Sequence, residues 1–326
     1  MSSHGKTYRQ VREQSRSSVV VPAEMSSGRP VVVGEVLFDV FPDGARVMGG
    51  APFNVAWHLQ ALGLQPLLIT RVGDDELGRE ILGEMGDWGM DVRGVQHDSR
   101  YPTGRVKVEL DGGEPRFEIA AEQAYDYLDP AAEPEAPLAE PAPLIYHGTL
   151  IARSEVSREA LFAYRGRLAA PVFLDVNLRP PWWREEEIAR ALLGARWVKL
   201  NADELRTLTG LPSADRAELI QTARDFRTRH ALEAVIVTLG EDGAFVVWHD
   251  ELLAGTPPAA VRDGDAVGAG DAFSAAFIAG IVWNWPPATT LSRALDLAAV
   301  ACALRGAVSR DRTLYERLVD QWGADR

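Results

Sequence analysis

The chain has little cysteine, no long apolar run and fewer basic than acidic residues, and each of these features excludes a class of site or partner. Of 326 residues only Cys302 is a cysteine, which excludes a disulfide framework and a cysteine-rich zinc site and is compatible with the cytoplasm, where we expect the protein. No apolar stretch reaches transmembrane length, so we expect no membrane partner. Asp and Glu outnumber Lys and Arg by 47 to 34, and this acidic balance argues against nucleic acid as a partner.

Two common nucleotide-binding loops are also missing. A Walker A loop requires the full pattern Gly-x-x-x-x-Gly-Lys followed by Ser or Thr, and this full pattern does not occur in the chain. The dinucleotide fingerprint requires a third glycine where Phe273 stands, and it normally follows the first strand of a domain. Any phosphate site must therefore be built in another way.

Residues 265–273 contain a Gly-Ala-Gly turn that runs directly into an apolar helical pattern. Phe273, Phe277 and Ile281 recur every four residues, so they share one helix face. Glycine lets the backbone bend and lets a ligand come close. Because the first amides of a helix lack partners and the helix dipole adds positive charge, the turn predicts an anion site suited to phosphate.

Asp271 stands at the mouth of this anion site, directly after Gly268, Ala269 and Gly270. The helix dipole favours its charged form, so we expect an ionised carboxylate. Beside a phosphate, such a group can accept the proton of a hydroxyl that attacks phosphorus. The alternative is an ordinary helix cap after a tight turn, and this stretch alone gives the two interpretations equal weight.

The rest of the chain alternates buried strand patterns with helical ones, which predicts an α/β fold with a mostly parallel sheet. Residues 1–28 are rich in serine and basic residues and have no long apolar centre, so we expect a disordered tail rather than a secretory signal. Two hairpins, within residues 35–48 and 106–119, interrupt the alternation and predict a flap outside the main sheet.

Polar residues around the first hairpin are candidates for binding a polyol. Asp39 lies at the end of a strand, and Gly49 and Gly50 open a helix that carries Asn54. The glycines let a ligand touch the backbone, while Asp39 and Asn54 can grip sugar hydroxyls. The alternative roles are a turn residue and a residue of a helix first turn, and each residue taken alone favours the alternative.

Three later segments carry further polar candidates. Arg179 follows a buried strand and can meet phosphate as a planar fork, or it is a surface arginine beside two prolines. Asn201 and Glu204 lie three apart at a helix start, where they can hold water around Mg²⁺ or form a capping box. The pair alone favours the capping box. Thr238 and Gly240 can border a nucleotide, or they form a plain hairpin turn.

In combination these segments resemble a known family. Gly49-Gly50-x-x-x-Asn54, Asn201-x-x-Glu204 and residues 265–271 match, in order and spacing, the motifs of the PfkB (ribokinase-like) carbohydrate kinases. The resemblance covers roughly residues 30–310. Within the family, the segments at 34–39, 50–54, 147–148 and 175–179 look like those of bacterial fructokinases.

The resemblance implies a three-layer α/β/α kinase domain over residues 29–326, with a β-sheet lid from about 36–48 and 101–120. It implies that ATP, with Mg²⁺, phosphorylates a primary hydroxyl of a neutral sugar, with fructose as the first candidate. Asp271 then becomes the base and the turn before it the anion hole. The other implied contacts are Asp39, Gly49, Gly50, Asn54 and Arg179 for the sugar, and Asn201, Glu204, Thr238, Gly240 and Gly243 for the Mg²⁺-nucleotide.

Two further expectations come from the resemblance alone. Family members often carry a monovalent-cation site, and the matching residues here are Asp265 and Val267, which makes K⁺ a candidate cofactor. Family resemblance also makes a homodimer through the lid a candidate assembly.

The chain departs from the family pattern at two places. Ala266 stands where the family usually has Thr, and residues 117–123 lack an arginine that fructokinases and 2-keto-3-deoxygluconate kinases commonly carry after the second lid hairpin. The missing charge weakens the interpretation as an acidic-sugar kinase and leaves fructose less secure. The alternatives are 2-keto-3-deoxygluconate or another substrate of the family, or a sugar- or nucleotide-binding regulator on a kinase fold.

Overall fold

The computed structural model describes residues 28–111, 114–132, 141–212, 215–258, 267–304 and 306–323. The expected N-terminal tail, apart from its last residue, lies outside the described residues, and so do Asp265 and Ala266. Within these ranges, no helix is both long enough and apolar enough to cross a membrane.

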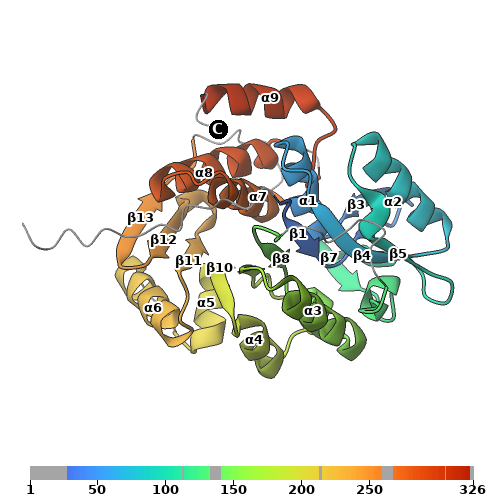
Figure 1. Ribbon diagram of the computed structural model, residues 1–326, viewed down its shortest axis with the longest axis horizontal. Coiled ribbons are helices and arrows are strands. Elements are labelled where there is room, and N and C mark those ends of the chain that lie inside the picture. Colours follow the sequence, from blue (N-terminus) through green and yellow to red (C-terminus); the bar gives the residue numbers. More distant parts are fainter. Residues whose placement is uncertain are drawn as a thin grey trace, which may run out of the picture.

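In the described part of the chain, nine strands form the central sheet (Figure 1). Neighbouring strands from β11 to β5 are parallel, and β12 and β13 are antiparallel additions at one edge. The parallel strands are short apolar runs because helices cover both of their faces. In spatial order the strands are β13 (Glu251–Gly255), β12 (Ala244–Trp248), β11 (Ala234–Thr238), β10 (Ala195–Asn201), β9 (Val172–Asp175), β8 (Ile145–His147), β1 (Val31–Val33), β4 (Leu67–Gly73) and β5 (Val95–Asp98).

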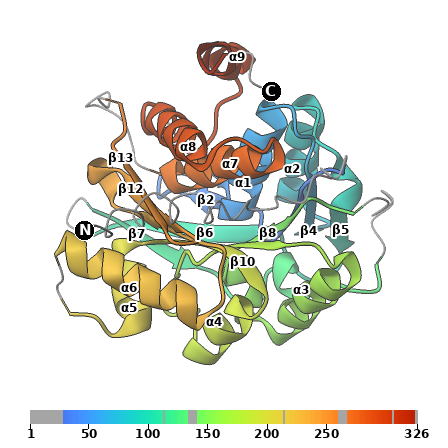
Figure 2. The same cartoon turned by 60° about the vertical axis from the view of Figure 1, so that its left-hand side comes forward.

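Helices cover both faces of this sheet, which makes three layers (Figure 2). One face carries α1 (Ala51–Ala61), α2 (Glu76–Asp87), α7 (Ala269–Val282), α8 (Pro287–Cys302) and, outermost, α9 (Arg312–Gln321). The other face carries α3 (Glu155–Leu168), α4 (Glu185–Leu192), α5 (Ala202–Thr209) and α6 (Arg216–Arg229). Short 3₁₀ helices are η1 (Val92–Gly94), η2 (Ala124–Tyr127), η3 (Leu150–Arg153) and η4 (Gly240–Asp242). The predicted three-layer α/β/α class is therefore confirmed.

Successive residues of the strands enter different cores. On β1, Val32 packs in the core beneath α1, α2, α7 and α8, whereas Val31 and Val33 pack in the core beneath α3. This follows from the two-residue repeat of a strand, which sends neighbouring side chains to opposite faces. Both faces are therefore sealed by apolar side chains, and polar groups concentrate at the strand ends.

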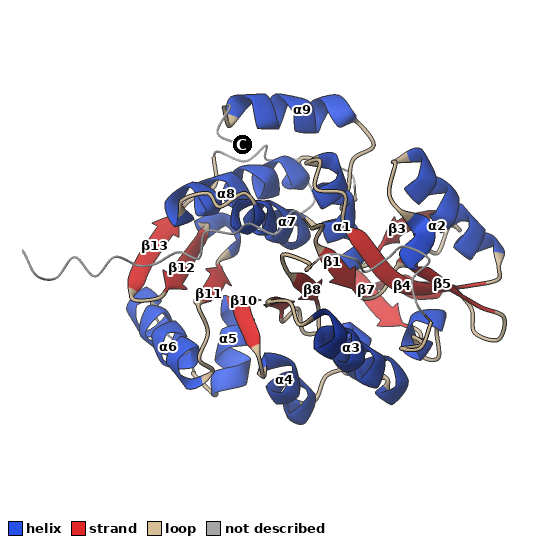
Figure 3. Ribbon diagram, in the orientation of Figure 1, coloured by secondary structure: helices blue, strands red, loops and turns tan. Residues whose placement is uncertain are grey.

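A second, smaller sheet contains both hairpins that the sequence predicts (Figure 3). Its strands, in spatial order, are β3 (Arg46–Gly49), β2 (Leu37–Val40), β6 (Gly104–Asp111) and β7 (Glu114–Ile119). Each hairpin is antiparallel, and β2 joins them by pairing with β6 in parallel. Because β2 follows β1 after only residues 34–36, the small sheet begins at the carboxyl end of the central strand β1.

The order of the parallel strands reverses at β1. From β1 the chain extends the sheet through β4 and β5 on one side, and later through β8, β9, β10 and β11 on the other. Open α/β sheets place ligands at such a switch, outside the carboxyl ends of the strands. The segments after β1, β9, β10 and β11, which carry most of the predicted site residues, all leave the sheet at this edge.

Candidate active site

Helix α7 begins with a left-handed glycine that no other residue could replace without strain. Gly268 is the N-cap, with φ of 80°, and a Cβ there would lie 2.4 Å from the Cβ of Ala307. From Ala272 to Gly280 every residue of the helix is buried, so α7 is held on all sides. Its first amides and the positive end of its dipole therefore point in a fixed direction, at the turn that the sequence predicts to bind anions.

Asp271 lies in the first turn of α7, and its carboxylate contacts α1 rather than the helix end. Asn54 Nδ2 donates to Asp271 Oδ2 at 2.8 Å, across 217 residues of sequence. The N-cap position belongs to Gly268, and no side chain caps the helix. The helix-cap alternative for Asp271 is therefore wrong, and the acid faces the residue predicted to contact sugar.

Burial raises the pKa of Asp271 from 3.8 to about 6. The neighbouring charge of Asp175 adds to this rise, while the hydrogen bond from Asn54 and the charges of Lys199 and Arg179 oppose it. Loss of solvent therefore outweighs the preference for the charged form that the helix dipole supplies. At neutral pH the carboxylate is still mostly ionised, and its pKa lies in the range that suits a general base.

A buried network beneath the turn connects two strands to α7. Lys199 Nζ, on β10, donates to both carboxylate oxygens of Asp175, on β9, at 3.0 and 2.8 Å. Ser274 Oγ donates to the same carboxylate at 2.9 Å, as does the Tyr146 hydroxyl at 3.3 Å. A Cβ on Gly270 would lie 3.4 Å from Lys199 Nζ, so the ammonium sits directly under the anion turn. Sequence reasoning missed Lys199, although a lysine within an otherwise apolar strand was a usable signal.

Of the predicted sugar contacts, Asn54 bonds directly to Asp271, while Asp39 and Asp271 are both affected by the charge of Arg179. Asp39 is partly exposed, and burial raises its pKa to about 6 against the lowering charge of Arg179. Gly49 lies opposite it, since a Cβ there would be 3.6 Å from Asp39 Oδ2. Asn54 is 5% exposed, and its Oδ1 has no hydrogen-bond partner among the described residues. Such an atom is a ready acceptor for a ligand hydroxyl.

The second glycine of the pair must be glycine for two reasons. Gly50 has φ of 108°, and a Cβ there would lie 2.7 Å from the carbonyl oxygen of Glu35. The start of α1 is thereby packed against the segment that follows β1. Sequence reasoning missed Glu35, which is 4% exposed and whose pKa burial raises to about 7.

Arg179 is exposed and yet close to the site. Its Nη1 lies 3.5 Å from the carbonyl oxygen of Leu178. Its charge nevertheless lowers the pKa values of Glu35, Asp39 and Asp271. Arg179 is therefore an exposed arginine whose charge reaches a group of carboxylates, and its contact with phosphate stays a prediction.

Asn201 and Glu204 form the capping box that the sequence favours for this pair. Asn201 Oδ1 accepts from the Glu204 amide, and Glu204 Oε2 accepts from the Asn201 amide, both at 2.8 Å. Glu204 Oε1 accepts from the Leu178 amide, also at 2.8 Å. A carboxylate oxygen has two lone pairs, so each keeps one free for a water molecule. The described ranges contain no cluster of three or more acidic, His or Cys ligands, which leaves water-mediated binding as the way this pair would fit Mg²⁺.

Predicted nucleotide contacts border an open cavity of about 490 Å³. Asn201, Thr238 and Gly240 line it, together with residues of α5 and α6. Gly243 does not line this cavity, and a Cβ there would lie 2.1 Å from the carbonyl oxygen of Gly255. Of the two residues proposed for a monovalent cation, Val267 is 42% exposed and Asp265 lies outside the described residues.

Comparisons with known proteins indicate the family of the whole chain. A family model described as pfkB family carbohydrate kinase matches residues 38–313. Fructokinase-1 of Zea mays is 31% identical over 280 residues, which cover 79% of this chain and 85% of the relative. A fructokinase of Klebsiella pneumoniae is 31% identical over 304 residues, covering 87% and 96%. A fructokinase double mutant of Vibrio cholerae, solved with fructose, ADP and a potassium ion, has a TM-score of 0.73 at 26% identity, covering 90% of this chain and 99% of that chain.

The family model and the two curated relatives each span most of the chain. The fold likeness to the Vibrio cholerae structure also extends over 90% of this chain. The resemblance drawn from the three sequence motifs is thus confirmed. The chain belongs to the pfkB family of carbohydrate kinases.

Proposed function

We propose that the protein transfers the γ-phosphate of ATP to a primary hydroxyl of a neutral sugar, with fructose as the first substrate to test. The observation that carries this proposal is the 2.8 Å hydrogen bond from Asn54 to Asp271, at the N-terminus of α7. This hydrogen bond connects Asn54, a predicted sugar contact, to the carboxylate of Asp271 in the first turn of α7. The fructokinase relatives and the fructose complex of the Vibrio cholerae protein support fructose as the substrate.

In this proposal each group has one task. Asp39 and the free Oδ1 of Asn54 hold sugar hydroxyls, and Asp271 accepts the proton of the hydroxyl that attacks the γ-phosphorus in line. The first amides of α7, at Gly268 to Gly270, stabilise the charge that develops on the transferred phosphoryl group. Arg179 adds a guanidinium over the carboxylates, where it can meet phosphate or substrate.

Asn201 and Glu204 would hold Mg²⁺ through water, and the bound ion would neutralise charge on the nucleotide phosphates. The small sheet is proposed as a lid that covers the sugar and as a surface for a homodimer. Phe117 on β7 is 52% exposed and Val47 on β3 is 39% exposed, so both edge strands of that sheet present apolar side chains. The potassium ion belongs to the Vibrio cholerae structure, and a matching role for Asp265 and Val267 is a proposal. A cytoplasmic location is likewise proposed.

The experiment is release of ADP from ATP over a panel that contains D-fructose, D-glucose, D-ribose and 2-keto-3-deoxygluconate. Phosphorus NMR of the product identifies the hydroxyl that is modified. We expect the largest kcat/KM with fructose and a phosphate monoester on a primary carbon. Absence of turnover with every sugar, or phosphate on a secondary hydroxyl only, would refute the proposal.

A further inference from the structure

Arg153, at the end of η3, is a buried arginine that the proposed mechanism does not use. Its side chain is 4% exposed. Nε and Nη2 donate to the two oxygens of Asp126 at 2.7 and 2.6 Å, and Nη2 also donates to the carbonyl of Ala120 at 2.7 Å. The guanidinium thus lies against residues 117–123, the segment where the sequence lacks an arginine.

Two aromatic rings hold this guanidinium in place. Its central carbon lies 5.0 Å from the ring centre of Tyr125 and 4.6 Å from that of Trp182. Because two of its three nitrogens are bonded and two rings pack against it, the guanidinium is held in one orientation. The third nitrogen, Nη1 of Arg153, is buried without a hydrogen-bond partner among the described residues.

Glu35 supplies an unpartnered acceptor in the same neighbourhood. Its Oε2 is buried without a hydrogen-bond partner among the described residues, as is the hydroxyl of Tyr125. The backbone next to Glu35 packs on Tyr125, since a Cβ on Gly104 would lie 2.7 Å from the carbonyl oxygen of Val36 and 2.8 Å from Tyr125 Cε1. The charge of Arg153 in turn lowers the pKa of Glu35 against the larger effect of burial. A buried polar atom without a partner is costly, and several in one place indicate a ligand that would satisfy them.

The chemistry of these atoms fits a sugar hydroxyl better than a sugar carboxylate. Arg153 Nη1 only donates, Glu35 Oε2 accepts when ionised, and the Tyr125 hydroxyl does both. A hydroxyl group also does both, whereas a carboxylate only accepts. The charge of Arg153 is already balanced by Asp126, and the charge of Arg179 is already shared by Glu35 and Asp271, so a sugar carboxylate would add one more negative charge to an acidic group.

We propose that Arg153 and Glu35 form a subsite that binds hydroxyl groups of a neutral sugar away from the reacting hydroxyl and disfavours sugars that carry a carboxylate. This inference rests on the proposed function, because it names the class of sugar that the site takes. It assigns specificity to η3 and to the end of β1, outside the three sequence motifs.

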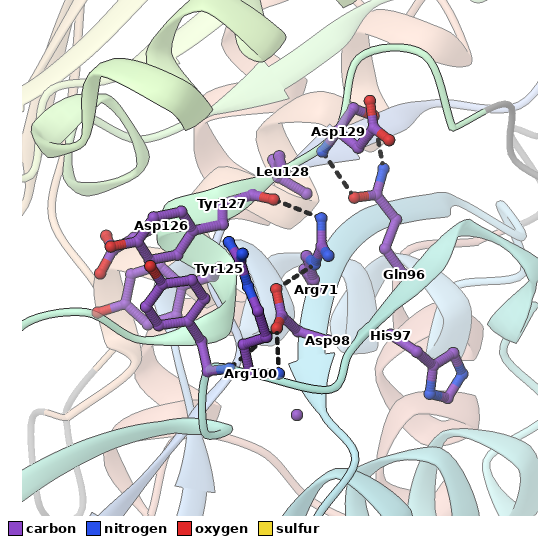
Figure 4. Close-up of polar contacts among 12 residues, drawn as sticks. Arg71, Gln96, His97, Asp98, Arg100, Tyr125, Asp126, Tyr127, Leu128 and Asp129 are labelled. Atoms are coloured by element: carbon purple, nitrogen blue, oxygen red, sulfur yellow. Dashed lines mark hydrogen bonds and ion pairs between the residues drawn. The ribbon is translucent and has the colours of Figure 1, made fainter.

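The test compares Arg153→Lys with Arg71→Lys, a matched control. Arg71 also anchors η2, since its Nη1 donates to the carbonyl of Tyr127 at 2.6 Å and its Nε lies 2.9 Å from Asp98 Oδ2 (Figure 4). Arg71 lines a separate cavity of about 440 Å³ to which no predicted site residue contributes. Each lysine keeps a charge for its acid partner and loses the guanidinium fork. Only Arg153→Lys removes a donor from the proposed subsite.

Calorimetric titration with D-fructose and kinetics with ATP are measured on the full chain, with thermal melting as a check on folding. We expect Arg153→Lys to weaken fructose binding and raise its KM by about tenfold or more, with the KM for ATP changed less than about twofold. Arg71→Lys leaves both constants within about twofold. We expect Glu35→Gln to lower the preference for fructose over 2-keto-3-deoxygluconate by about tenfold.

The outcomes separate this inference from the kinase proposal. If fructose binds, Arg153→Lys weakens it and no phosphate is transferred, the subsite stands and the kinase proposal fails. If fructose is phosphorylated and the two lysine variants behave alike, the subsite fails and the kinase proposal stands. Preference of the unmodified protein for 2-keto-3-deoxygluconate, or no binding of any neutral sugar in the panel, overturns the inference.

Discussion

Replacing Glu35 by glutamine should stabilise the ligand-free protein at high pH and have little effect at low pH. Glu35 is 4% exposed, and burial raises its pKa from 4.5 to about 7 in the folded protein. The folded state therefore binds this proton more tightly than the unfolded state. Stability is lost as pH rises from 4.5 through 7, and the whole loss is present above pH 7. Glutamine does not ionise, so the variant does not lose this unfolding free energy as pH rises.

The size of the effect follows from the two pKa values. A rise from 4.5 to about 7 corresponds to roughly 3 kcal/mol of unfolding free energy once the carboxyl is fully ionised. At pH 5 the unfolded state has released much of its proton already, but the folded state keeps its own, so the cost is about 1 kcal/mol or less. We therefore expect the advantage of Glu35→Gln to grow by about 2 kcal/mol between pH 5 and pH 8.

The assay is urea unfolding of the unmodified protein and Glu35→Gln at pH 5, 6, 7 and 8, at constant ionic strength. Glu316→Gln, which changes an exposed glutamate on α9, is the matched control and should show no such trend. If the stability difference stays constant with pH, or shrinks as pH rises, then folding does not raise the pKa of Glu35 and this reasoning is wrong.

Other expectations follow from the turn, the network beneath it and the base. Gly268→Ala should cost roughly 2–4 kcal/mol in urea unfolding, because its φ is 80° and its Cβ would lie 2.4 Å from a neighbouring Cβ. Gly210→Ala, with φ of 67° and open space, should cost only about 1 kcal/mol; equal losses would contradict the packing argument. Asp175→Asn should cost about 3–5 kcal/mol by leaving a buried ammonium unpaired, while Asp203→Asn, 89% exposed, should cost under about 0.5 kcal/mol. Because Asp271 must be ionised to accept a proton, kcat/KM should fall as pH drops through about 6; a flat profile down to pH 5 would exclude that role.

The secondary structure around the site was largely predictable because it depends on local patterns. Apolar runs such as Val31–Val33 indicate a buried strand by themselves, and both hairpins of the small sheet carry their turn signals in sequence. β13 was not predicted because an edge strand is mostly exposed and lacks a buried run. The order of the strands was not predictable either, since any parallel strand can neighbour any other without a local signal.

Some residues of the candidate site could also be predicted from the sequence, whereas the contacts between them could not. Asp271, Asn54 and Glu204 stand in motifs whose residue types point to their chemistry, so they could be named from sequence. Their partners could not be named, because the bond from Asn54 to Asp271 joins positions 217 apart. Arg153 looks like an ordinary solvated arginine before a helix, and only the packing of Asp126 against it reveals its burial.

The most direct test of the account is kcat for Asp271→Asn at saturating D-fructose and ATP. Asparagine keeps the size of the side chain and removes its capacity to accept a proton. We expect kcat to fall by about a hundredfold to ten-thousandfold, with fructose binding changed less than about threefold, and we expect no fall for Asp87→Asn, an exposed acid on α2. If Asp271→Asn retains more than about a tenth of the original kcat, this carboxylate is not the base and the proposed mechanism is wrong.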